Sequence, residues 1–233
     1  MKNDKKHRFD FDKETYIKTK KKRKYKCAIC KSINHSIFIY SMDELKDAYI
    51  CAHCHSVMKA LRFNGYSLVK DDEIVDSGIY DFGRNSLRNW KVSYFIKFKN
   101  YRYDTGLDTI HHFIFNFIDI LKTSMKICGI EYCSKINEIE NSKLNELKHA
   151  LTVIHYFYGY GFIMTSQEHE ELHKEYGYRI DAKVLKDEII KRHPDKKYML
   201  NRMFDLIKNS YIRRMKLLKS NYVYKKYLNL EDK

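Results

Sequence analysis

The sequence predicts an α+β protein in which an N-terminal ribbon-like pair of cysteine knuckles precedes a central strand–strand–helix unit and a basic helical C-terminal region. Three features support this class: two Cys-x2-Cys motifs near the N-terminus, two short apolar segments followed by a polar, histidine-rich segment, and apolar residues at helical spacing near the C-terminus. We expect a basic lead-in at 1–24, the cysteine region and a connector at 25–84, the central unit at 85–180 and the helical tail at 181–233.

Composition and charge narrow the choice of partner. The 233 residues include 8 Gly and 1 Pro, and 44% are hydrophobic, which favours an ordered core over a disordered chain. The 45 Lys and Arg against 30 Asp and Glu give a formal net charge of +15, which suits an anionic partner. Nucleic acid is the leading partner and an anionic membrane surface the second. No segment approaches the roughly 18 apolar residues that span a bilayer, so we expect no membrane insertion.

The first 24 residues are polar and basic. They lack the apolar segment of a secretory signal, so we expect a cytoplasmic protein. They end in a cationic run at residues 20–24 (KKKRK). This run is either a solvated tail or an arm that contacts phosphates, and the sequence leaves both interpretations open.

Two Cys-x2-Cys pairs, separated by 20 residues, are formed by Cys27 and Cys30 and by Cys51 and Cys54. In a reducing compartment this spacing indicates metal binding rather than disulfides. Four thiolates complete a tetrahedral site with no open position, so we expect a structural zinc ion in a zinc ribbon-like fold. We interpret His53 and His55 as neighbours of this site. Cys128 and Cys133 lack matching partners and are expected to be core or surface thiols.

A helix is expected to follow a short strand at residues 162–164. Thr165 and Glu168 form a capping box at its start, and Gly177 is a natural terminator. His169 and His173 then lie four residues apart on one helical face, an arrangement that lets two imidazoles bind one ion.

A second pair of histidines ends a strand predicted within residues 107–113 (LDTIHHF). A strand–strand–helix unit can bring His111 beside His169 and His173, and three imidazoles would hold a divalent ion with positions left for water and a phosphate oxygen. Adjacent strand residues point in opposite directions, so His112 faces away from this ion. An imidazole with a pKa of about 6.5 suits a general base that takes a proton from the attacking water.

These segments resemble the HNH (His-Me finger, ββα-metal) endonucleases, and most closely the phage-type HNH homing endonucleases. The resemblance covers residues 85–180 and rests on Asn-Trp-Lys at 89–91, Ile-His-His-Phe at 110–113, HYFYGYG at 155–161, and a helix that carries His169, His173 and then Tyr-Gly. It implies DNA cleavage in a bacterial host cell, with His111 and His173 as metal ligands, His169 as a further ligand or helix anchor, and His112 as the general base. For His155, at a recurrent position, we expect a structural role.

The metal, the DNA contacts and the oligomeric state are only partly defined. An all-imidazole site favours transition metals over Mg²⁺, and Mg, Mn, Zn and Ni stay open. Four basic residues before the histidine strand either grip backbone phosphates or form a solvated face: Lys91, Lys97, Lys99 and Arg102. One metal and one base cut one strand, so double-strand cleavage would need a homodimer or two sequential nicks.

Two other functions explain parts of the sequence. Residues 169–173 (HEELH) also satisfy the H-E-x-x-H pattern of zinc peptidases, with Glu170 as base and Glu188 or His193 as third ligand. The polar start of the helix and the net charge argue against a peptidase. A non-catalytic, zinc-stapled DNA-binding protein would explain the charge and the cysteines but not the four histidines. Phe115 stands in place of a proline that is common in the HNH family. This departure leaves open a degenerate copy of the nuclease that binds DNA without cutting it.

The C-terminal tail is expected to form two helices separated at Pro194. In the second helix, apolar residues recur at helical spacing at Met199, Met203, Phe204, Ile207, Tyr211, Met215 and Leu218. The other faces are crowded with Lys and Arg. They are either a solvated face or a surface that contacts DNA.

Overall fold

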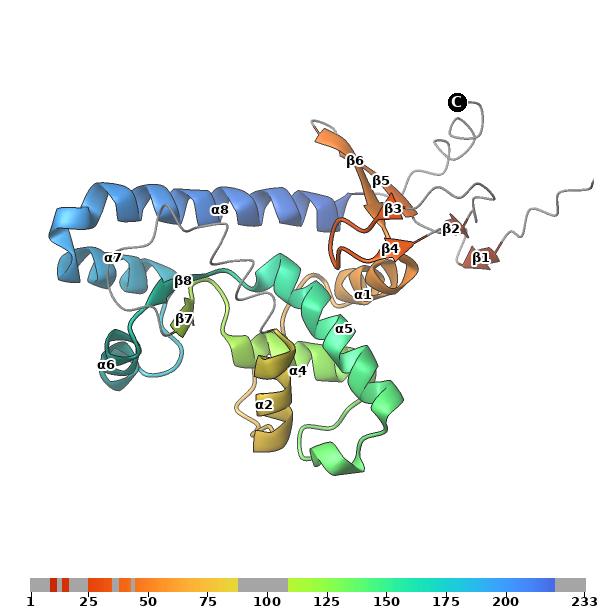
Figure 1. The fold of residues 1–233 in the computed structure, drawn as a ribbon, viewed down its shortest axis with the longest axis horizontal. Coiled ribbons are helices and arrows are strands. Elements are labelled where there is room, and N and C mark those ends of the chain that lie inside the picture. The colour runs from red at the N-terminus through yellow and green to blue at the C-terminus, as the bar shows by residue number, and fades with distance from the viewer. Residues whose placement is uncertain are drawn as a thin grey trace, which may run out of the picture. The chain divides into compact units, whose positions relative to one another are not determined.

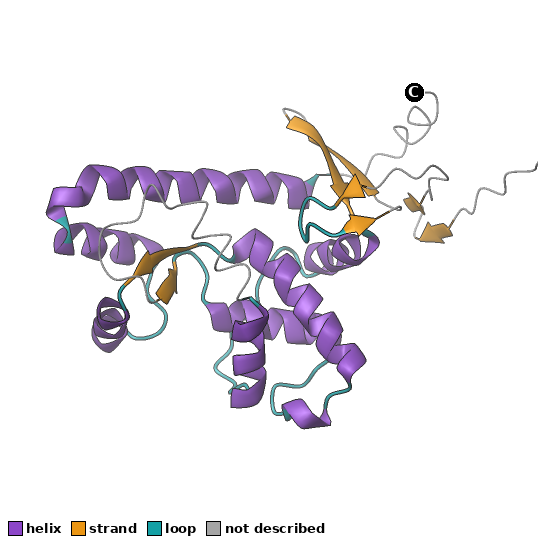
Figure 2. Cartoon of the chain, in the orientation of Figure 1, coloured by secondary structure: helices purple, strands orange, loops and turns teal. Residues whose placement is uncertain are grey.

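The computed structural model describes residues 9–11, 14–16, 25–34, 38–42, 45–87 and 109–220. Within these ranges the chain mixes helices with two-stranded antiparallel sheets, which confirms the α+β composition (Figure 1, Figure 2). The predicted phosphate contacts Lys91, Lys97, Lys99 and Arg102, and the cationic run at 20–24, lie outside the described residues. Among the described helices, none combines the length and the apolar character needed to cross a membrane.

The chain divides into two compact units. One comprises the described parts of Met1–Ser67 and Arg214–Lys233, and the other those of Leu68–Arg213. The division after Ser67 falls inside the region 25–84 that the sequence assigns to cysteines and connector.

The first unit contains three hairpins and a helix. The elements are β1 (Phe9–Phe11) with β2 (Glu14–Tyr16), β3 (Tyr25–Lys26) with β4 (Ile33–Asn34), β5 (Phe38–Met42) with β6 (Leu45–Ile50), and α1 (Ala52–Phe63). Helix α1 buries Val57, Met58 and Leu61 on one face, as helical periodicity requires. The Arg62 side chain donates to the backbone oxygens of Leu218 and Ser220, each at 2.8 Å, and so ties α1 to the C-terminal end of the chain's last helix.

The second unit holds one hairpin among helices. Its elements are α2 (Ser77–Ser86), β7 (Thr109–His112), α4 (Phe117–Cys128), η2 (Ile136–Glu138), α5 (Asn141–Tyr158), β8 (Gly161–Met164), α6 (Ser166–Tyr176), α7 (Ala182–Arg192), η3 (Pro194–Lys196) and α8 (Lys197–Lys219), of which the residues after Arg213 belong to the first unit. Strands β7 and β8 are antiparallel, with His111 opposite Phe162 and His112 opposite Gly161.

The predicted boundaries of the histidine helix are confirmed. Helix α6 begins after Thr165, whose side-chain oxygen accepts a hydrogen bond from the Glu168 backbone N–H at 3.1 Å. It ends at Gly177, which has a φ of +75°, in the left-handed region that favours glycine. The tail also divides as predicted, because Pro194 opens the short turn between α7 and α8.

One apolar core holds the hairpin, α6, α7 and α8 together. Its buried members are Phe113, Tyr160, Met164, Leu172, Leu185, Ile189, Leu200, Met203, Phe204 and Ile207. Leu172 is the fully buried residue of α6 in this core, and it lies between His169 and His173 in the sequence. Burying the face that carries Leu172 therefore fixes the direction in which His169 and His173 point.

A polar network fixes the loop after α6 against α4. The Arg179 guanidinium lies 3.2 Å from Asp119 Oδ1 and donates to the Asp71 backbone oxygen at 2.9 Å. Lys122, of which 1% is exposed, pairs with the Asp71 carboxylate. A buried ammonium needs such a partner, because isolated burial of a charge is strongly unfavourable.

Candidate metal centre and active-site pocket

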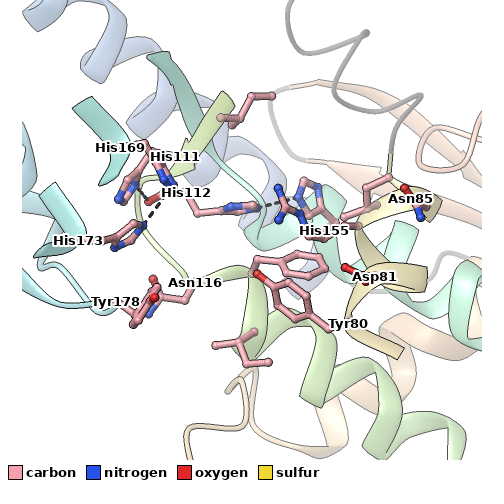
Figure 3. Close-up of a pocket in the computed structure, with 15 residues that line it drawn as sticks. Tyr80, Asp81, Asn85, His111, His112, Asn116, His155, His169, His173 and Tyr178 are labelled. Atoms are coloured by element: carbon pink, nitrogen blue, oxygen red, sulfur yellow. Dashed lines mark hydrogen bonds between the residues drawn. The ribbon is translucent and has the colours of Figure 1, made fainter. Parts of the chain in front are cut away.

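Three histidines from β7 and α6 converge on one point. His111 is the third residue of β7, and His169 and His173 occupy consecutive turns of α6. The Nε2 atoms of His169 and His173 are 3.2 Å apart, and the His111 ring centroid lies 5.1 Å and 5.0 Å from theirs. One ring nitrogen from each residue falls within 4.8 Å of the others (Figure 3). The structure thus brings together the three predicted ligands.

Backbone carbonyls orient two of these rings. His111 Nδ1 lies 2.6 Å from the His112 carbonyl oxygen, and His173 Nδ1 lies 3.0 Å from the Gly177 carbonyl oxygen. A carbonyl oxygen only accepts, so both Nδ1 atoms carry the hydrogen, and in the neutral form of each ring Nε2 carries a lone pair. This is the usual support of a metal-ligating histidine, whose second nitrogen donates to a carbonyl or carboxylate.

The geometry fits a metal ion. Bonds of about 2.0–2.1 Å in a tetrahedral site place two ligand nitrogens about 3.4 Å apart. The separation of 3.2 Å between the Nε2 atoms of His169 and His173 is close to this value. All three ligand nitrogens lie within 4.8 Å of one another, so small movements of the side chains would bring them to the spacing of a tetrahedral site. Burial lowers the pKa of His111 to about 3 and that of His169 to about 4, so both are neutral at pH 7, the form that binds metals.

His112 lies on the other side of β7, in line with the alternation of strand side chains. Its Nε2 is 3.1 Å from the Nε2 of His155 on α5, and the two rings meet edge to face with centroids 5.3 Å apart (Figure 3). Burial lowers the pKa of His112 to about 4, so its imidazole is neutral at pH 7 and can accept a proton. The contact between His112 and His155 was not predicted from the sequence.

Two glycines permit these close approaches. A Cβ on Gly161 would lie 2.4 Å from the His111 carbonyl oxygen, where β7 and β8 pair. A Cβ on Gly159 would lie 2.3 Å from the ring of His155. Neither position accommodates a side chain without moving a histidine of the site.

A pocket of about 760 Å³ joins the histidines to α2. Besides the five histidines it is lined by Tyr80, Asp81, Arg84, Asn85, Leu87, Ile110, Asn116, Phe117, Ile118 and Tyr178. Burial is the main cause that lowers the pKa of His112 and of His169; a neighbouring histidine and then the charge of the exposed Arg84 lower it further. Tyr178 is 82% exposed, with its ring centroid 5.0 Å from that of His173.

In the sequence, α2 falls within the region expected to be a connector, so Arg84 was not predicted to line the site. Asp76 gave a signal for this helix, because it caps α2 by accepting from the backbone N–H of Gly78 at 2.9 Å. Helix α2 packs against α4 and α5, and this tertiary packing brings Arg84 to the pocket.

The peptidase arrangement is absent from the described residues. Glu170 is exposed, Glu188 bonds to the Arg192 guanidinium at 3.1 Å, and His193 bonds to Glu168. The residue that joins His169 and His173 is His111, from a strand far away in the sequence.

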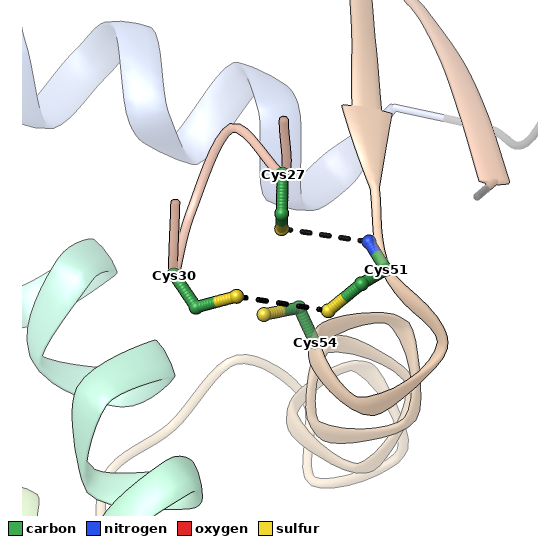
Figure 4. A group of neighbouring side chains, drawn as sticks. All are labelled: Cys27, Cys30, Cys51 and Cys54. Atoms are coloured by element: carbon green, nitrogen blue, oxygen red, sulfur yellow. Dashed lines mark hydrogen bonds between the residues drawn. The ribbon is translucent and has the colours of Figure 1, made fainter. Parts of the chain in front are cut away.

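The four predicted zinc ligands also converge, in the first unit (Figure 4). Their sulfur atoms lie within 4.8 Å of one another, and Cys30 and Cys51 are 3.7 Å apart, close to the roughly 3.8 Å set by Zn–S bonds of about 2.3 Å. A hydrogen bond from the Cys27 thiol lowers the pKa of the Cys30 thiol. This cluster can hold a metal ion, consistent with structural zinc.

The second cysteine pair departs from the predicted ribbon-like knuckle pair. Cys27 and Cys30 lie in a turn between β3 and β4, but Cys51 caps α1 and Cys54 lies in its first turn. The apolar periodicity of α1 accounts for a helix here. Its N-terminus favours thiolate ligands, because the helix dipole is positive at that end. His55 stacks on Phe38 with centroids 3.8 Å apart, and is a neighbour of the cluster, not a member.

No family model, no curated protein and no solved structure matches the chain. The chemistry of the two centres follows from their ligands. Four sulfurs form a closed site suited to a structural ion, whereas three imidazoles beside a pocket leave positions for water and a substrate oxygen.

Proposed function

We propose that this chain is a metal-dependent DNA endonuclease that hydrolyses phosphodiester bonds, in which β7, β8 and α6 form a ββα-metal unit of the HNH type. The observation that supports it most is the placement of His112. It follows His111, one member of the three-imidazole cluster, on the same strand, points to the other side of that strand, and lines the same pocket. A metal site and a proton acceptor are thus available to one substrate.

A divalent ion held by His111, His169 and His173 would stabilise the negative charge that develops on the phosphate and on the leaving oxygen. The neutral imidazole of His112 takes a proton from a water molecule while the water oxygen attacks phosphorus. The bond between phosphorus and the leaving oxygen breaks, the leaving oxygen takes a proton from solvent water, and the imidazolium returns its own proton to solvent. Nδ1–H donation from His111 and His173 to backbone oxygens keeps the ligand rings fixed throughout.

Arg84 supplies the cation for substrate binding. It projects from α2 into the pocket wall and is close enough to shift the pKa of His112 and His169. A guanidinium binds phosphate through paired N–H donors, so Arg84 is suited to a phosphate next to the scissile bond. The net charge of +15 favours the same polyanionic substrate.

A second function is favoured by one observation on α8. Its apolar side is buried through Met203, Phe204 and Ile207, whereas Arg202 and Arg213, which lie about three turns apart on the opposite side, are exposed. Such a cationic helix face could bind DNA in a non-catalytic, zinc-stapled protein. This function does not account for the histidine cluster, so we rank it second.

Plasmid cleavage distinguishes the two functions. Supercoiled DNA is incubated with the full chain and Mg²⁺, Mn²⁺, Zn²⁺ or Ni²⁺, with and without EDTA, beside His112→Ala. Metal-dependent nicking that is lost in the variant supports the nuclease. DNA binding without nicking under every metal supports the non-catalytic protein. Conversion to linear DNA without accumulated nicked circles would indicate a homodimer that cuts both strands.

A further inference from the structure

His155 is a buried histidine for which the mechanism above has no use. It lies near the end of α5, with 1% of its surface exposed, yet it lines the pocket with His112. Its Nε2 approaches the Nε2 of His112 to 3.1 Å. A histidine that only fills a core would not need a ring nitrogen within hydrogen-bond distance of another side chain that lines the pocket.

The role of His112 as general base sets the direction of this hydrogen bond. In each ring one nitrogen carries a hydrogen and the other a lone pair. If His112 is to accept a proton from water, the nitrogen that accepts must be Nδ1, because Nε2 faces His155. His112 Nε2 then carries the hydrogen and donates it to the Nε2 of His155.

We propose that His155 is the positioning residue of the general base, which holds His112 in the tautomer with hydrogen on Nε2 and a lone pair on Nδ1. This proposal rests on the proposed nuclease function. When a water O–H bond breaks and the proton binds to Nδ1, His112 becomes an imidazolium. Its Nε2–H bond to His155 then strengthens, because a charged donor makes a stronger hydrogen bond. His155 thus favours the protonated state of the base in the transition state.

The backbone around His155 supports a specific ring position. The backbone N–H of Gly159 donates to the His155 carbonyl oxygen at 2.8 Å, and the ring lies against the Gly159 Cα, where a Cβ would approach within 2.3 Å. The ring therefore occupies space that any residue other than glycine at 159 would fill. This contact sets the ring's edge toward His112.

Two substitutions test the role. His155→Leu keeps an apolar side chain of similar reach and removes the acceptor, whereas His155→Gln can place an amide oxygen near the former Nε2. We expect His155→Leu to lower kcat about 10- to 100-fold with KM unchanged, and His155→Gln to recover part of the loss. In a His112→Ala background, His155→Leu should cause no further loss. Equal kcat in wild type and His155→Leu, or an additive loss in the double variant, would overturn the proposal.

Imidazole ¹⁵N NMR tests the same contact without metal or substrate. We expect His112 of the wild type to show hydrogen on Nε2 alone and His155→Leu to show a mixture of tautomers; an unchanged His112 spectrum would overturn the proposal. If the wild type cuts DNA and the His155 variants cut equally well, only this inference fails. If the wild type cuts with none of the four metals, the nuclease function fails and the inference fails with it.

Discussion

His169 and His173 face each other across one turn of α6, with Nε2 atoms 3.2 Å apart. His173 Nε2 carries a lone pair, because its Nδ1 hydrogen bonds to the Gly177 oxygen, so a cation or a proton must lie between the two rings. A metal ion held here would satisfy both nitrogens at once, together with a ring nitrogen of His111.

Removing one ligand should therefore remove one ion. We expect the wild type to bind two zinc ions per chain, at the cysteine cluster and at the histidine cluster, and His173→Ala to keep only the first, as measured by elemental analysis after dialysis. His193→Gln is the matched control, since His193 lies nearby but bonds to Glu168. Two tightly bound ions in His173→Ala would contradict the assignment of the ligands.

Gly161→Ala should disturb the metal site through the backbone. The new Cβ would lie 2.4 Å from the His111 oxygen, so β7 must shift from β8. We expect a loss of about 1–3 kcal/mol in the free energy of unfolding, measured with urea, together with weakened metal binding at the histidine cluster.

Gly129→Ala serves as the control for this substitution. Gly129 has a φ of +64° and open space around it, so alanine adds backbone strain without touching the site. It should lower stability and leave metal occupancy intact. If both variants keep the second ion equally well, Gly161 does not support the site.

Arg84→Gln should slow cleavage more than it weakens DNA binding. We expect the loss of one preorganised cation beside the reacting phosphate to lower kcat by about 100-fold, while other cations of the chain would still hold the duplex. Single-turnover cleavage and filter binding measure the two effects separately. Lys126→Gln is the control. Lys126 is exposed near the C-terminal end of α4, whereas the pocket is lined by Phe117 and Ile118 at the N-terminal end, so this change should alter neither the cleavage rate nor DNA binding. Equal behaviour of the two variants would exclude Arg84 from the site.

The local boundaries of the site could be predicted because their signals are local. Thr165 and Glu168 cap α6, Gly177 ends it, and a spacing of four places two histidines on one face. The partners of these residues could not be predicted in this way. His155 and Arg84 reach the pocket because α5 and α2 pack against each other and against α4, and no spacing in the sequence encodes that packing.

In the cysteine region the ligands could be predicted, but the element that carries the second pair could not. The ligand spacing predicted the cluster, but the second pair was placed on a knuckle instead of a helix. Val57, Met58 and Leu61 carry the helical periodicity that distinguishes these alternatives, and Cys51 stands immediately before it. Metal-ligand spacing alone therefore identifies the ion site without defining the fold that presents it.

Cys51→Ser should release the structural ion and destabilise α1. The free energy of zinc binding to such a cluster is folding free energy, so we expect zinc-dependent thermal stability in the wild type and its loss in the variant. Cys133→Ser is the control, because Cys133 is exposed and outside the cluster. Unchanged zinc content in Cys51→Ser would contradict the four-sulfur site.

Stability should depend on pH through His112. Its folded pKa of about 4 lies below the ordinary value of 6.5, so between these values the unfolded chain binds a proton that the folded chain does not. The free energy of unfolding should fall as pH drops from 6.5 to 4. In His112→Gln the slope should be shallower by up to about 1.4 kcal/mol per pH unit. Urea unfolding in metal-free buffer checks this, and identical slopes would show that His112 titrates normally.

The most direct test of the metal site and the base together is a crystal structure of the full chain with a short DNA duplex and Zn²⁺, with the ions located by anomalous scattering. We expect one ion about 2.0–2.1 Å from a ring nitrogen of each of His111, His169 and His173, with a backbone phosphate oxygen on the ion and His112 facing that phosphate. An ion bound elsewhere, or a duplex whose phosphates lie away from His112, would contradict the proposed nuclease.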